Sequence, residues 1–204
     1  MDIEQFLDDI SGIEDIIYWG ELADCVDELC QSWSERGRRL VNDYHNARDQ
    51  FYASIPGPDE KAGKEEFIMP CITAMYDATL DIELHAYYRG TELARAFAKG
   101  DDPLATIPDY DTLIDYCSAQ SIALKHQDEL NLQLAKLERE IPEANWQMYR
   151  AALQFFFKIS HTCAGFYLVA GYMVENSLMK YAYKDFQPSD AQTRQLIERI
   201  LLHN

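Results

Sequence analysis

The sequence predicts an all-α protein, a single domain of residues 1–204 folded as a bundle of about six to eight helices. Apolar residues recur at steps of three and four along most of the chain, the spacing of one helix face. Glycine (9) and proline (7) are few and cluster between these stretches, and β-hairpin signals are missing. Because 48% of the residues are hydrophobic, a chain of 204 residues can bury a substantial core.

The N-terminal part of the chain is expected to form two helices. The first covers about residues 2–10, and Ser11-Gly12-Ile13-Glu14 has the form of a capping box that opens the second. Apolar residues then mark one long amphipathic helix, in which Gly37 interrupts the apolar seam. This seam consists of Leu22, Val26, Leu29, Trp33, Leu40, Tyr44, Ala47 and Phe51.

The middle of the chain is divided by proline and glycine. Pro56-Gly57-Pro58 ends the preceding helix, and the next one ends at Lys99-Gly100, a C-cap signal. Pro70 lies within that stretch, so a helix either begins there or kinks. Asp109 or Asp111 is expected to cap a further helix that runs to about residue 140.

The C-terminal part contains the most apolar segment, residues 151–174, and we expect this helix to lie at the centre of the bundle. It includes Lys158 and His161, which are costly in lipid, so we interpret it as a core helix and not as a membrane span. Gly165 and Gly171 are expected to permit close helix packing. A last short helix follows residues 187–189, with a buried edge formed by Leu196, Ile200 and Leu201.

The expected location is the cytoplasm. The N-terminus has neither the basic nor the apolar region of a secretory signal. The five cysteines are odd in number and lack a Cys-x-x-Cys pair, which favours free thiols in a reducing compartment over a disulfide framework or a zinc site.

Acidic residues are concentrated at the N-terminus. The formal net charge is −17, and residues 1–35 hold no lysine or arginine. The other 24 acidic residues face all 18 basic ones, so about two-thirds of the excess negative charge belongs to this segment. Its eleven acidic residues are Asp2, Glu4, Asp8, Asp9, Glu14, Asp15, Glu21, Asp24, Asp27, Glu28 and Glu35.

The sign of this charge limits the classes of partner. A surface of this kind repels the phosphate backbone of nucleic acids and the anionic face of a membrane, so neither is expected as a partner. It attracts basic proteins and accelerates their encounter. The sequence therefore favours a module that binds a basic protein.

In size, helicity and charge across the whole chain, the protein resembles the acidic all-α immunity proteins of bacterial polymorphic toxin systems. This resemblance implies that the chain neutralises a cognate toxin by covering its active site, with the acidic helices in place of a polyanionic substrate. Aromatic side chains are expected to anchor the contact. The predicted partner-binding residues are Asp8, Asp9, Asp15, Tyr18, Trp19, Asp24, Asp27 and Glu28.

The sequence is also compatible with two other functions. Histidines at positions 45, 85, 126 and 161 would serve a metal-dependent or hydrolytic enzyme, and three of them stand near an acid at helical spacing, as in Asp81 with His85 and His126 with Glu129. We interpret these pairs as surface pairs and predict no catalytic residue, metal or cofactor. Long amphipathic helices would also suit a self-associating structural or regulatory subunit.

Overall fold

The computed structural model describes residues 3–16, 18–54, 58–109, 112–113, 120–139 and 143–201. Over these residues the chain is helical and has no strand, which confirms the all-α class. The α-helices are α1 (Ile3–Asp9), α2 (Trp19–Trp33), α3 (Glu35–Ser54), α4 (Pro58–Ala98), α6 (Gln120–Leu137), α7 (Glu143–Ala182) and α8 (Asp190–Leu201). Two 3₁₀ turns, η1 (Ile13–Asp15) and η2 (Pro103–Thr106), lie between them.

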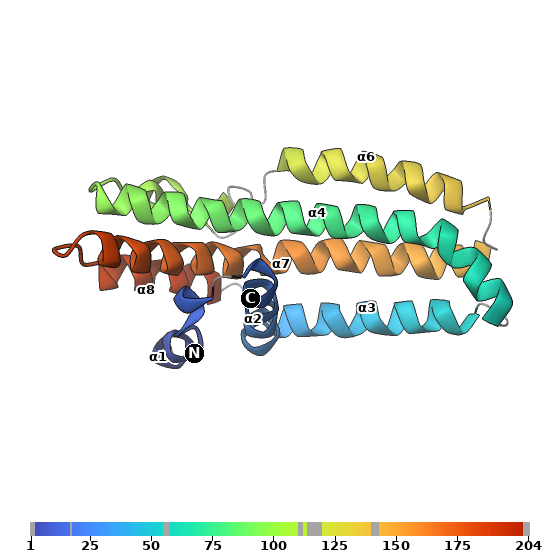
Figure 1. Cartoon of the computed structure of the whole chain (residues 1–204), viewed down its shortest axis with the longest axis horizontal. Helices are drawn as coiled ribbons and strands as arrows, with labels where there is room; N and C mark the ends of the chain where they lie inside the picture. The colour runs from blue at the N-terminus through green and yellow to red at the C-terminus, as the bar shows by residue number, and fades with distance from the viewer. Residues whose placement is uncertain are drawn as a thin grey trace.

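Two long helices, α4 and α7, run side by side along the molecule (Figure 1). Toward one end, α3 packs on α7 and α6 packs on α4. Helices α2 and α8 and the turn η1 also contact α7, and α1 contacts α8. Helix α7 contains the apolar segment 151–174, and its residues 162–172 are all buried.

Helices α4 and α7 meet backbone to backbone at two glycines. A Cβ atom on Gly90 would lie 2.0 Å from the Leu168 carbonyl oxygen, and one on Gly171 would lie 2.0 Å from the Tyr87 carbonyl oxygen. No side chain fits at either distance, so each helix supplies a glycine where the other approaches. The close packing expected at Gly171 is confirmed, whereas Gly90 was not singled out.

The predicted long helix after residue 11 is broken at Ser34. This residue is extended (φ −116°, ψ 112°) and separates α2 from α3. Its Oγ accepts a hydrogen bond of 2.9 Å from the Gly37 backbone N–H, as an N-cap of α3 does. The Ser34 N–H still bonds to the Cys30 carbonyl at 2.9 Å, and the Ser34 carbonyl accepts from the Arg38 N–H at 3.0 Å, so α3 starts directly where α2 ends. Gly37 permits close packing, since a Cβ there would lie 3.0 Å from Cys30 Sγ.

The predicted capping box at residues 11–14 does not open a helix. Ser11 Oγ donates instead to the Asp8 carbonyl at 2.6 Å, which closes the end of α1. Gly12 adopts a left-handed φ of 88° and leads into the single turn η1. Helix α2 begins later than predicted, at Trp19.

Three other boundary predictions agree with the structure. Gly100 has φ 86°, and the Asp101 N–H reaches back to the Ala96 carbonyl at 3.0 Å, as in a Schellman C-cap. Asp109 Oδ1 accepts a hydrogen bond of 2.8 Å from the Thr112 N–H. Pro70 lies inside α4, whose first turns are inclined to the rest of the helix (Figure 1).

In α8, the edge formed by residues 196, 200 and 201 is buried.

The N-terminal segment is anchored to the core by aromatic packing. Phe6 of α1 is fully buried, 5.3 Å from the Trp33 ring of α2 and 6.2 Å from the Phe166 ring of α7, centroid to centroid. Edge contacts of this kind add to the apolar area that each ring buries. The acid-rich N-terminal segment is therefore packed onto the core through α1 and α2, and these helices are not a loose tail.

In the described part of the chain, no helix combines the length and the apolar character needed to cross a membrane. Cys25, Cys30 and Cys163 are free thiols. The side chains of Cys71 and Cys117 lie outside the described residues.

Candidate partner-binding surface

Exposed carboxylates occur on α1, η1 and α2, and we call the seven that follow below the N-terminal acidic surface. Helices α1 and α2 lie on the same side of α7 in Figure 1. Asp24 and Glu28 are one turn apart and share a face of α2. The exposed members of the surface are Asp8, Asp9, Glu14, Asp15, Glu21, Asp24 and Glu28.

Within the described part of the chain, no member of this surface forms an ion pair. Among the described residues, the N-terminal segment forms one ion pair, between Glu4 and Arg194 of α8, and Glu4 is outside the surface as defined. Asp9 is held by neutral donors: Gln5 Nε2 at 2.8 Å and Trp33 Nε1 at 2.9 Å. The remaining charge of the surface is therefore not neutralised by described basic side chains, and it projects a negative field into solvent.

The two predicted aromatic anchors are in different environments. Tyr18, directly before α2, is 74% exposed. Trp19 is half-buried: its ring lies edge-on to Tyr87 at 5.5 Å and stacks on Tyr167 at 5.9 Å. Tyr18 is therefore available to a partner, whereas Trp19 fastens the start of α2 to α4 and α7.

Asp27 differs from the other predicted contact residues because its carboxylate bonds inside the protein. The Tyr167 hydroxyl donates to Asp27 Oδ1 at 3.1 Å, and the Asp27 side chain is half-buried. Burial raises its pKa to about 6, the charge of Asp24 adds to the rise, and the Tyr167 hydrogen bond opposes it. Asp27 is thus removed from the N-terminal acidic surface.

Glu83 of α4 faces the same buried group. Its side chain is nearly inaccessible, and desolvation, reinforced by the charge of Asp27, raises its pKa to about 8. A hydrogen bond with Tyr167 partly offsets this rise. Glu83 is therefore mostly protonated at neutral pH, which avoids two adjacent buried anions.

The tyrosine and cysteine of α7 complete this group. Burial, together with the charges of Glu83 and Asp27, raises the pKa of the Tyr167 hydroxyl, which stays a donor. A hydrogen bond with Cys30, together with burial, raises the pKa of the Cys163 thiol well above its usual range. Because Tyr167 is fully buried, we interpret this group as a polar contact with a single carboxylate charge, that of Asp27, which joins α2 to α4 and α7.

One of the predicted histidine–acid pairs forms with another partner in the structure. His126 of α6 bonds across to Asp81 of α4, with 2.7 Å between Nε2 and Oδ2, and not within its own helix. His85 accepts from Arg89 Nε at 3.4 Å. His45 is exposed, and the side chain of His161 lies outside the described residues. Within the described part of the chain, no three metal-binding side chains are grouped.

The sequence contained one usable signal for the buried polar group. Ala23, Asp27 and Cys30 follow the i, i+4, i+7 spacing of one helix face, which places Asp27 on the inner side of α2. Charge alone would instead group Asp27 with Asp24 and Glu28. Glu83 and Tyr167 come from helices far apart in the chain, so their meeting requires the tertiary structure.

No family model, curated protein or solved structure matches this chain.

Proposed function

We propose that the chain is a protein-binding module that neutralises a basic partner through its N-terminal acidic surface. The observation that carries this proposal is that the exposed carboxylates of the N-terminal acidic surface form no ion pair with a described basic side chain. A purely solubilising surface would serve equally well with its charge spread over the molecule, whereas here one segment without lysine or arginine holds most of the excess.

The negative field accounts for the first stage of binding. It draws a positively charged protein toward α1 and α2 and favours its orientation before contact. Tyr18 then supplies apolar area and a hydroxyl at an exposed position, the kind of residue that dominates binding energy at interfaces. The rigid attachment of α2 through Trp19 limits the conformational entropy lost on binding.

The partner that best suits this surface is a cognate toxin in the cytoplasm that acts on a polyanionic substrate. The active site of such an enzyme is basic, so exposed carboxylates on α2 would occupy the place of substrate phosphates. The chain would then act as an immunity protein by occlusion. This part of the proposal rests on charge complementarity and on the resemblance in size, helicity and charge to acidic immunity proteins.

The test is capture from a lysate of the native host at low salt, followed by affinity measurement with the captured protein. The test variant combines Asp15→Asn, Asp24→Asn and Glu28→Gln, three exposed carboxylates of η1 and α2. The control variant removes three exposed carboxylates elsewhere, by Asp101→Asn, Asp128→Asn and Glu138→Gln.

Both variants lose the same formal charge, so they separate the position of the charge from its amount. We expect the dissociation constant to rise at least about tenfold in the test variant and about twofold or less in the control. An equal effect in both variants, or no effect in either, would overturn the assignment of the surface. A captured protein without excess basic residues would overturn the assignment of the partner.

A further inference from the structure

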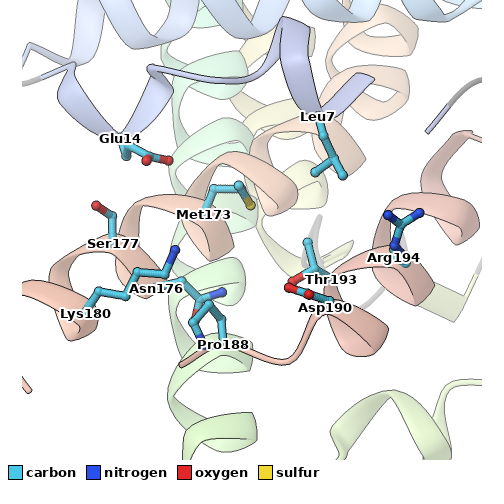
Figure 2. Close-up of a pocket in the computed structure, with 10 residues that line it drawn as sticks. All are labelled: Leu7, Glu14, Met173, Asn176, Ser177, Lys180, Pro188, Asp190, Thr193 and Arg194. Atoms are coloured by element: carbon cyan, nitrogen blue, oxygen red, sulfur yellow. The ribbon is translucent and has the colours of Figure 1, made fainter. Parts of the chain in front are cut away.

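A polar hollow of about 180 Å³ lies where α1, η1, α7 and α8 meet, and we call it the α7–α8 pocket. Figure 2 shows its lining side chains. Leu7, Met173 and Pro188 supply apolar wall, and the rest of the lining is polar or charged. These polar residues are Glu14, Asn176, Ser177, Lys180, Asp190, Thr193 and Arg194.

Asn176 has an unmet hydrogen-bonding requirement at this pocket. Its side chain is only 5% exposed, and its Nδ2 is buried without a hydrogen-bond partner in the described structure. A buried donor without an acceptor is costly, and native proteins retain few of them. The volume far exceeds the space that a single water needs, so it admits a larger occupant. It is also smaller than the pockets of nucleotides or large cofactors.

The pocket has hydrogen-bond donors toward one side and the carboxylate of Asp190 toward the other. Lys180, which forms no ion pair among the described residues, lies with Ser177 and Asn176 toward one side in Figure 2. Together they offer an ammonium, a hydroxyl and an amide N–H to an acceptor group. Asp190 lies on the other side, next to Thr193.

Two further charged residues line the pocket, Arg194 and Glu14. Arg194 is already paired with Glu4, so it adds little to the binding of an anion. The exposed carboxylate of Glu14, from η1, gives the pocket a second negative group besides Asp190. A simple anion would satisfy Lys180 and Asn176 but would face these two carboxylates. An occupant with both a carboxylate and an ammonium group would meet Lys180 and Asn176 with the first group and Asp190 with the second.

We propose that the α7–α8 pocket binds a small zwitterion of amino-acid size. Its carboxylate accepts hydrogen bonds from Asn176 Nδ2 and from Lys180, and its ammonium group lies toward Asp190. A short aliphatic or hydroxylated side chain fits the wall formed by Leu7, Met173 and Pro188. Apart from Glu14, no residue that lines this pocket belongs to the N-terminal acidic surface.

The experiment titrates the full chain, without any partner, with glycine, L-alanine and L-serine by isothermal calorimetry and by amide chemical shifts. Acetate and methylammonium at the same ionic strength serve as the two halves of the ligand. We expect saturable binding of at least one amino acid below about 10 mM, and binding at least about tenfold weaker for each half. Amide shifts should concentrate on residues 173–180 and 188–194.

Three variants test the named contacts. Asn176→Leu removes the amide donor at similar size and should weaken binding about tenfold. Lys180→Met should weaken it by a similar factor, and because Lys180 is exposed this variant does not depend on core packing. Lys184→Met, an exposed lysine outside the lining, is the matched control and should leave affinity unchanged.

Two results would overturn the proposal. One is the absence of saturable binding by all three amino acids up to about 10 mM, a concentration at which only very weak sites stay empty. The other is binding that Asn176→Leu and Lys180→Met leave unchanged, which would place the ligand elsewhere.

Discussion

Replacing Glu83 with glutamine should change how the stability of the protein depends on pH. The pKa of Glu83 is raised from 4.5 to about 8, mainly by burial, so between these values the native state holds a proton that the unfolded chain has released. The contribution of Glu83 to the free energy of unfolding is therefore greatest below the pKa of the unfolded chain. This contribution is lost as the pH rises to the pKa of the folded protein. The loss is about 1.4 kcal/mol per pH unit, or up to about 4 kcal/mol between about pH 5 and pH 8.

Glutamine has nearly the shape of the protonated acid and cannot ionise, so the variant should escape this loss. Urea unfolding followed by circular dichroism at about pH 5, 6.5 and 8 gives the free energy of unfolding of both proteins. Relative to the natural chain, Glu83→Gln should gain up to about 4 kcal/mol as the pH rises over this range. Asp77→Asn, an exposed acid of the same helix, is the control and should follow the natural chain. A constant difference between Glu83→Gln and the natural chain at all three pH values would refute the account of a buried, protonated Glu83.

Three further substitutions test the packing. Gly171→Ala should lower the free energy of unfolding by about 3 kcal/mol or more, because its Cβ would meet the Tyr87 carbonyl oxygen at 2.0 Å. The control Gly20→Ala, at an open helical position, should not destabilise the protein. Equal effects of the two substitutions would contradict the close crossing of α4 and α7. Ser34→Ala should cost about 1 kcal/mol in chemical unfolding through the lost cap of α3, and no loss would argue against the cap. Trp33→Phe should lower the free energy of unfolding by about 1 kcal/mol, because the hydrogen bond to Asp9 is lost, and it should speed amide exchange in α1. Unchanged exchange would show that this hydrogen bond does not hold α1 in place.

The all-α class and several helix ends could be predicted because local rules determine them. The apolar spacing of Leu196 and Ile200, the glycine at position 100 and the cap at Asp109 each act within a few residues. The break at Ser34 was missed because the apolar seam continues through it, and periodicity does not detect a one-residue interruption. Gly90 was missed because its function depends on the helix that crosses it.

The partner-binding surface was only partly predictable from charge. Charge identified the N-terminal segment, and Asp8, Asp15, Asp24 and Glu28 are exposed there. Charge alone places Asp27 with these residues, whereas its half-buried carboxylate accepts a hydrogen bond from Tyr167. The α7–α8 pocket could not be anticipated, because it joins residues of four elements from both ends of the chain.

The central claim is that the N-terminal acidic surface steers a basic protein into contact. The most direct measurement is the association rate constant of the captured partner as a function of ionic strength, by stopped-flow fluorescence, for the natural chain and for the variant with Asp15→Asn, Asp24→Asn and Glu28→Gln. Because salt screens exposed charges, the account predicts a rate that falls at least about tenfold between about 0.02 M and 0.5 M salt for the natural chain, and a clearly shallower fall for the variant. Equal salt dependence in the two proteins, or a rate indifferent to salt, would contradict it.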